Sequence, residues 1–166
     1  MISKVPRAVR ERVLPRPDRD DAFAALSAAL TGFSVLELAG TGVGDRYLAF
    51  LTRVFPDVLP DLLAAWSDVA RQPPGEVEVA LRARILDDAK LGPFARQILE
   101  LWYTASWTPM PAAWNSAYGD HHDGFDAELT AVAFPEGLMW RAGIGTHPTA
   151  ARPTGFGTWA FRPREA

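Results

Sequence analysis

The densest group of residues able to do chemistry is a short loop of histidines and aspartates. Residues 119–124 read Gly-Asp-His-His-Asp-Gly and place His121 and His122 beside two carboxylates. Imidazole and carboxylate groups are ordinary ligands of divalent metals. Adjacent loop histidines diverge, however, and His147 is distant in sequence. We therefore expect a solvated loop, with no metal and no other cofactor in this chain. The alternative is a stand-alone metal-dependent enzyme, or a helical adaptor, that uses the His121–His122 loop.

Two further patterns resemble catalytic or phosphate-binding motifs, and neither is complete. One is a triad on paper, made of Ser106 or Ser116, His121 and Asp123. No Gly-x-Ser-x-Gly elbow accompanies it. The other is Gly-x-Gly-x-Gly over residues 40–44, where a phosphate-binding loop would follow a strand and space its third glycine further on. We interpret these glycines as a turn between helices, and we expect no catalytic residue in the chain.

Composition is that of a globular domain with no sign of a nucleic-acid partner. Of the 166 residues, 48% are hydrophobic and 22% charged, and the net charge is −3. These values are close to those of ordinary soluble domains, and the basic stripe of a nucleic-acid-binding protein is missing. No run of about 18 apolar residues exists, so we expect no membrane span. The absence of cysteine excludes disulfides and thiolate metal sites.

The first twenty residues are basic and rich in proline. Five arginines and three prolines interrupt any apolar stretch there. A secretory signal needs an apolar segment of at least about seven residues, and no twin-arginine pair occurs. We expect residues 1–20 to form a flexible basic leader. The absence of a signal favours a cytoplasmic location, or a periplasmic one if the chain is exported with a partner.

Apolar spacing predicts helices through the first two-thirds of the chain. The first expected helix runs from Asp20 or Asp21 to about Leu38. Four more are expected over 45–55, from near Pro60 to before 73, over 76–88 and over 94–106, and a short helix is possible over 126–134. From Arg141 onward, repeated glycine and proline oppose regular structure. The prediction is a mostly α fold: a small helical domain of about five helices over residues 21–140, then a long irregular tail rich in glycine, proline and tryptophan over residues 141–166, extended and partner-binding.

Tryptophan gives the strongest sign of an interaction surface. The chain has six, and five of them follow residue 100. Tryptophan buries a large area, needs a partner for its N–H, and is enriched at interface hot spots. The rings could be anchors in pockets of another chain. Alternatively, they could form a tryptophan-rich core that holds an irregular segment in place.

Several segments, taken in order, resemble a known family. They are Ala-Arg-Ile-Leu at 83–86, Phe-Ala-Arg-Gln-Ile-Leu-Glu-Leu-Trp-Tyr-Thr at 94–104, Gly-Leu-Met-Trp at 137–140, Gly-Thr-His-Pro at 145–148, and Gly-Phe-Gly-Thr-Trp-Ala at 155–160 with Pro163. Together they resemble the small-subunit family of FAD-dependent D-sorbitol and D-fructose dehydrogenases. The looser N-terminal similarity begins near Phe23.

The resemblance implies a helical, non-catalytic companion of a large flavoprotein. That partner is of the glucose-methanol-choline class, holds the FAD and the catalytic histidine, and oxidises a sugar, polyol or glycoside. The small chain stabilises it and, in exported members, carries it through the twin-arginine route. A cytochrome c subunit often completes the complex. This chain departs from the pattern in lacking the export signal and in its long insert between Trp107 and Leu138.

The expected partner contacts combine the resemblance with the tryptophan signal. They are Trp102, Tyr103, Trp107, Trp140, His147, Phe156 and Trp159. We expect the tail from Arg141 to Pro163 to lie in a groove of the large subunit, since its glycines allow close backbone approach. Trp140 and Trp159 would be its anchors.

Overall fold

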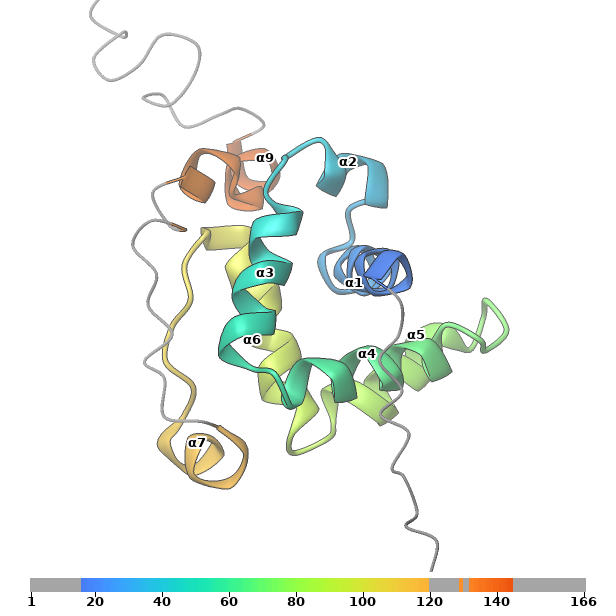
Figure 1. Ribbon diagram of the computed structural model, residues 1–166. Helices are drawn as coiled ribbons and strands as arrows, with labels where there is room; N and C mark the ends of the chain where they lie inside the picture. Colours follow the sequence, from blue (N-terminus) through green and yellow to red (C-terminus); the bar gives the residue numbers. More distant parts are fainter. Residues whose placement is uncertain (1–15, 120–128, 130–131, 145–166) are drawn as a thin grey trace, which may run out of the picture.

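The computed structural model of the chain describes residues 16–119, 129 and 132–144, and this part is all helical, without strands (Figure 1). Its elements are α1 (Arg16–Thr31), α2 (Val35–Ala39), α3 (Gly44–Val54), α4 (Val58–Val69), α5 (Val77–Leu81), the π-helical turn η1 (Arg82–Leu86), α6 (Leu91–Thr104), α7 (Ala112–Tyr118), the 3-10 turn η2 (Phe134–Glu136) and α9 (Leu138–Ile144). The predicted mostly α fold is confirmed, with more helices than the five expected. None of the described helices is long and apolar enough to cross a membrane.

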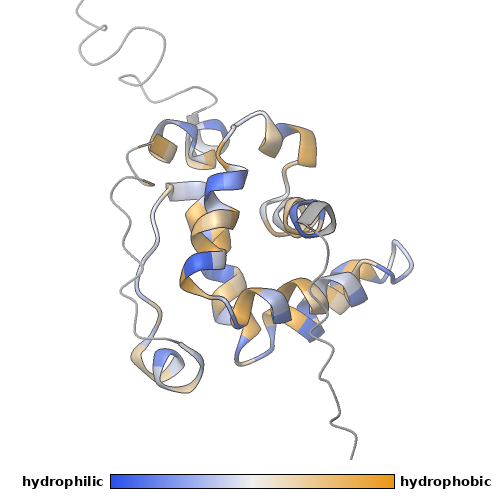
Figure 2. Cartoon of the chain, viewed as in Figure 1, coloured by the Kyte–Doolittle hydropathy of each residue, from blue (hydrophilic) through white to orange (hydrophobic). Residues whose placement is uncertain are grey.

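Helix α1 is the central element of the fold. It packs against α2, α3, α4 and α6. The apolar faces of α3, α4 and α6 turn toward the interior, while their outer faces are polar (Figure 2). Phe23 and Leu26 are three residues apart, a spacing that predicts one helix face, and they are 2% and 0% exposed. The predicted apolar stripe of this helix is therefore its buried face.

A cluster of aromatic rings fills the space between α3, α6 and α7. We call it the aromatic core, and its members are Phe50, Phe55, Phe94, Trp107 and Trp114. Phe55 lies 5.0 Å from both Phe94 and Trp107, measured between ring centroids. Trp114 stacks on Phe94 at 6.1 Å and donates its indole N–H to the Lys90 carbonyl at 2.8 Å. Such edge-to-face and stacked pairs stabilise a core beyond the area they bury.

Both predicted boundaries of the first helix are wrong. It begins at Arg16, so residues 16–20 of the expected leader belong to α1. It ends at Thr31, because Gly32 takes a left-handed conformation with φ of 79°. Ser34 then starts α2 with a capping box, in which its side chain accepts from the Glu37 N–H while the Glu37 carboxylate accepts from the Ser34 N–H. Serine followed three residues later by glutamate is a helix-start signal, and it divides the expected helix in two.

Three later boundaries also differ from expectation. Helix α6 begins at Leu91 rather than Phe94. Helix α7 occupies a stretch in which no period was recognised, and α9 continues past Arg141 to Ile144, into the expected tail. Most of the expected helix over 126–134 lies outside the described residues. The glycine run over 40–44 is the predicted turn between helices, since Gly40 caps α2 and Gly44 begins α3.

Candidate functional site

Helices α2 and α9 lie at the same end of the molecule (Figure 1), and several exposed apolar side chains belong to this part of the structure. Among the described residues six large apolar side chains are exposed, and four of them lie at this end: Val35, Leu36, Val132 and Phe134. Leu36 is the extreme case, with 82% of its surface exposed. We call these four, with Trp140 of α9, the α2–α9 surface. Large apolar side chains that are exposed near one end of a molecule are candidates for an interaction site.

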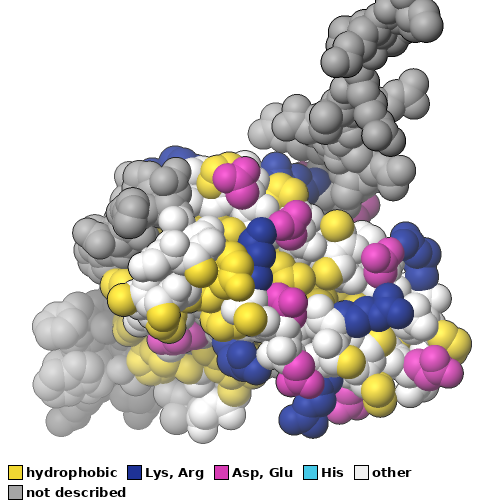
Figure 3. Space-filling model, turned by 90° about the horizontal axis from the view of Figure 1, so that it is seen from below, with side chains coloured by type: hydrophobic (Ala, Val, Ile, Leu, Met, Phe, Trp, Pro, Cys, Tyr) yellow, Lys and Arg dark blue, Asp and Glu magenta, His cyan; other side chains and the backbone are white. Residues whose placement is uncertain are grey.

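The opposite end of the molecule looks different. Seen from below, acidic and basic side chains are interspersed among the apolar ones (Figure 3). The remaining two exposed large apolar residues of the described part are Val79 of α5 and Tyr118 of α7, and they belong to separate helices. Single exposed apolar residues are normal on a protein surface. Val79 is therefore a suitable reference for the α2–α9 surface.

Electrostatics connect α2 with α9. Hydrogen bonds from the Ser34 hydroxyl and backbone N–H, at 2.7 and 2.8 Å, hold the pKa of the Glu37 carboxyl below its ordinary value. The positive charge of Arg141 on α9 lowers the same pKa further. A coulombic effect of this kind requires that the two groups approach each other. Glu37 of α2 and Arg141 of α9 therefore lie near each other at this end of the molecule.

Trp140 is held in place by its own neighbourhood. Its indole N–H donates to the Phe134 carbonyl at 2.9 Å, and the two rings meet edge to face at 5.4 Å between centroids. The Trp140 ring is only half-buried, and Phe134 is 42% exposed. The pair therefore presents a rigid aromatic edge to solvent without an unsatisfied N–H.

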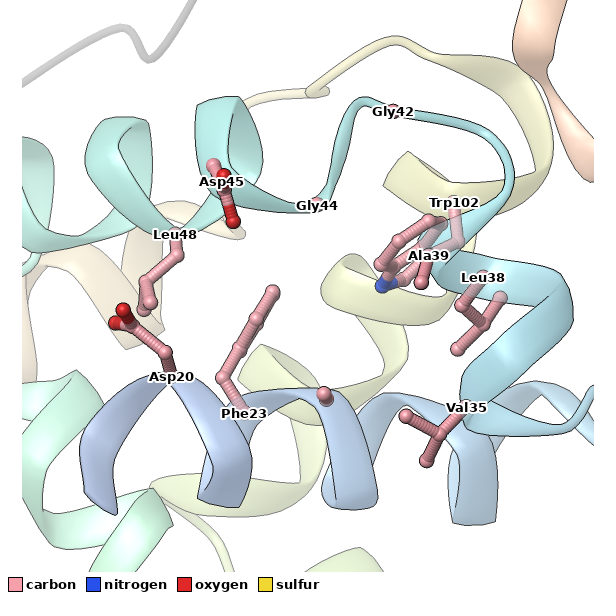
Figure 4. A pocket seen from close by; sticks show the side chains of 11 residues that line it. Asp20, Phe23, Val35, Leu38, Ala39, Gly42, Gly44, Asp45, Leu48 and Trp102 are labelled. Atoms are coloured by element: carbon pink, nitrogen blue, oxygen red, sulfur yellow. The ribbon is translucent and has the colours of Figure 1, made fainter. Parts of the chain in front are cut away.

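A cavity of about 230 Å³ opens beside α2, between α1, α2 and α3 (Figure 4). Most of its lining is apolar: Phe23, Ala24, Val35, Leu38, Ala39, Leu48 and Trp102, with Gly42 and Gly44 of the connecting turn. Two carboxylates, those of Asp20 and Asp45, lie at the end of the cavity away from Val35. No basic side chain of the described residues lines it. The cavity thus has an apolar end and an acidic end.

The wall of the cavity nearest the core is rigid. Trp102 is 2% exposed, and its indole N–H donates to the Ser27 hydroxyl at 3.0 Å. Tyr47 meets the Trp102 ring edge to face at 4.9 Å. Burial, and secondarily the negative charge of Glu136, raise the pKa of the Tyr47 hydroxyl, so it is neutral at physiological pH. The cavity is accordingly bounded by side chains that are fixed by packing and a buried hydrogen bond.

The expected partner-binding residues divide into four groups. Trp102 and Trp107, at 2% and 4% exposure, are packed in the core of this chain, so neither projects from the surface as the expected anchors would, although Trp102 also lines the cavity. Tyr103 is half-buried and donates its hydroxyl to the Thr31 carbonyl at 3.2 Å. Trp140 lies on the α2–α9 surface. The remaining three, His147, Phe156 and Trp159, lie outside the described residues.

The histidine–aspartate loop also lies outside the described part of the chain, together with the paper triad's His121 and Asp123. Within residues 16–119, 129 and 132–144 no group of three histidines or carboxylates could hold a metal ion. The site that sequence reasoning missed is the α2–α9 surface with its cavity. Its one readable signal was the Ser34–Glu37 capping box, which would have separated Leu36 from the buried face of α1.

Comparisons with protein-family models, with curated proteins and with solved structures found no match to this chain.

Proposed function

We propose that the chain is the non-catalytic small subunit of a large FAD-dependent dehydrogenase of the glucose-methanol-choline class, which oxidises a sugar, polyol or glycoside. The FAD and the reacting groups belong to the large subunit, and this chain stabilises that subunit by binding it. A cytochrome c subunit is the further partner that the family resemblance implies. The resemblance of residues 83–104 and of the segments after 137 motivates the choice of partner class.

The observation that carries the proposal is the α2–α9 surface. Four of the six exposed large apolar side chains of the described residues share this end of the molecule. Leaving a leucine exposed forgoes about 1.5–3 kcal/mol of burial free energy, which a partner subunit recovers when it covers the residue. Residues 137–140, part of the resemblance, include Trp140 of this same surface. A docking role for the α2–α9 surface accounts for both facts.

Co-expression tests the proposal. The tagged chain is produced with flavoproteins of this class from the same genome, captured, and scanned for flavin absorbance. A yellow partner that co-purifies in a fixed ratio and oxidises a sugar or polyol is the expected result. A colourless 18.2 kDa protein with no companion would overturn it. Metal analysis of the same sample shows whether the chain carries a metal instead.

Two matched variants locate the contact. Leu36→Asp places a charge on the α2–α9 surface at its most exposed residue, and Val79→Asp places the same charge on α5, where the original valine is 70% exposed. Burying an unpaired carboxylate against an apolar partner costs several kcal/mol. We expect Leu36→Asp to reduce captured flavoprotein by at least about tenfold and Val79→Asp to leave it unchanged. Equal capture of the flavoprotein by both variants would show that the α2–α9 surface is not part of the interface.

A further inference from the structure

We infer that the cavity between α1, α2 and α3 is a receptor site for a partner segment in which a bulky apolar side chain is followed by an arginine or lysine. The inference rests on the proposed function only in taking the large flavoprotein as the source of that segment. The chemistry it requires can be tested without any flavoprotein. The argument depends on the shape of the cavity, on its two ends and on the surface beside it.

The apolar end of the cavity is suited to one large side chain. Val35 and Leu38 of α2, with the Trp102 ring, line this end (Figure 4). The whole cavity, with its acidic end, measures about 230 Å³, so its apolar end has room for no more than one large side chain. Trp102 is fixed by the Ser27 hydrogen bond and by Tyr47, so an incoming side chain meets a preformed wall. A preformed pocket reduces the entropic cost of binding.

The acidic end of the cavity favours a basic residue next to the bulky apolar one in the partner segment. The carboxylates of Asp20 on α1 and Asp45 on α3 lie on either side of the cavity, next to Phe23 and Leu48 (Figure 4). Both aspartates are exposed, and neither forms an ion pair or side-chain hydrogen bond with another described residue. Two like charges without a counter-charge attract a cationic group and repel an anionic one. A guanidinium or ammonium group is the complement that the described residues do not supply at this end.

The cavity adjoins the surface proposed above to bind the partner. Val35 both lines the cavity and belongs to the α2–α9 surface, and Leu36 is its neighbour in the chain. A partner helix or strand that covers Leu36 therefore passes the cavity mouth. Its apolar side chain would enter at the Val35 end, and its basic residue would reach Asp20 and Asp45.

A peptide titration tests the chemistry directly on the isolated full chain. N-acetyl-Phe-Arg-amide and N-acetyl-Phe-Glu-amide are added separately while NMR follows the Trp102 indole N–H and the methyl groups of Val35, Leu38 and Leu48. We expect the arginine peptide to shift these signals and to bind at least about tenfold more tightly than the glutamate peptide, because the two aspartates attract one and repel the other. Equal binding of the two peptides, or shifts elsewhere on the molecule, would overturn the inference.

Variants of the complex test the same site in its proposed setting. Asp20→Asn with Asp45→Asn removes the two carboxylates, and Glu78→Gln with Asp87→Asn makes the same charge change at exposed positions on α5 and after η1. Ala24→Phe fills the cavity from α1. We expect the aspartate pair to lose about tenfold in flavoprotein affinity and most of its salt dependence, and Ala24→Phe to lose more. The control pair should match the wild type, with all thermal melts taken to verify folding.

The outcomes separate the two proposals. If the wild-type chain captures no flavoprotein, the proposed function is wrong. The peptide titration alone then shows whether the cavity is a receptor site. Capture that is unaffected by both the aspartate pair and Ala24→Phe leaves the proposed function standing and overturns the receptor site.

Discussion

The interior of the molecule and the α2–α9 surface both contain tryptophan, and the indole N–H groups are bonded differently in the two regions. In the interior, the N–H groups of Trp102 and Trp114 donate to groups that are 75 and 24 residues away in sequence. On the surface, the N–H of Trp140 donates to a carbonyl only six residues away. The interior rings therefore join distant segments, whereas Trp140 is positioned by its own segment. An anchor that is fixed before it meets a partner binds with less loss of side-chain entropy.

The largest difference between the two regions should appear in stability. Trp102→Ala removes a fully packed ring together with its hydrogen bond, and we expect a loss of about 3–5 kcal/mol in the free energy of unfolding. Leu36→Ala removes an exposed side chain and should change that free energy by no more than about 0.5 kcal/mol. Chemical denaturation of both variants gives the comparison. A similar loss in the two would mean that α2 is packed more tightly than its exposure indicates.

Gly137 and Gly143, which flank Trp140 in the sequence, allow a second comparison between a packed and an open position. A Cβ at Gly137 would lie 2.8 Å from the Tyr103 carbonyl oxygen, whereas a Cβ at Gly143 meets nothing within 4 Å. We expect Gly137→Ala to destabilise the protein by about 1–3 kcal/mol, because the backbone of α6 must move. Gly143→Ala should stabilise α9 by up to about 1 kcal/mol. Thermal melts distinguish the two, and a neutral Gly137→Ala would show that α9 is free to shift away from α6.

The serine beneath Trp102 provides a test inside the core. Ser27→Ala leaves the Trp102 N–H buried without its acceptor, and we expect a cost of about 1–2 kcal/mol. Ser67 also lies on a helix, but its hydroxyl only donates to the Leu63 carbonyl within the same helix. Ser67→Ala should therefore be nearly neutral in the same denaturation series. Equal effects would show that the Ser27–Trp102 bond adds nothing to the packing around it.

The smallest effect concerns pH and the start of α2. Ser34 hydrogen-bonds the ionised form of Glu37, so its pKa in the folded chain lies below that in the unfolded chain. The resulting stabilisation is complete above the unfolded-state pKa and is lost as pH falls through the lower folded-state pKa. NMR titration of Glu37 should give a depressed pKa that rises when Ser34 is replaced by alanine. No change in Ser34→Ala would mean that Arg141, rather than the capping box, sets it.

Regular apolar spacing made the helical core predictable. Phe23 and Leu26 occupy the face that their spacing indicated, and the α3, α4 and α6 stripes are likewise buried. Helix α7 was not predictable in the same way. It has seven residues and is held by Trp114, whose ring and N–H contact Phe94 and Lys90 from other parts of the chain. The sequence of residues 112–118 alone does not predict contacts with such distant residues.

The candidate site was predicted only in part. Tryptophan content pointed to Trp140, which is partly exposed, and equally to Trp102 and Trp107, which are buried in the core. Residue type gives the tendency of tryptophan to be buried without saying which chain buries it. The cavity brings together residues from α1, α2, α3 and α6. Its existence follows from how these helices pack, which their separate patterns do not specify.

The Ser27–Trp102 hydrogen bond also has a consequence for synthesis. The two residues are 75 positions apart, so a ribosome adding about 5–20 residues per second makes Trp102 roughly 4–15 s after Ser27. During that interval the buried face of α1, with Phe23 and Leu26, has no α6 to cover it. During synthesis, the growing chain therefore passes through a stage in which α6 does not yet cover the apolar face of its central helix. Slow translation of residues 28–101 would lengthen the period in which chaperones have to shield it.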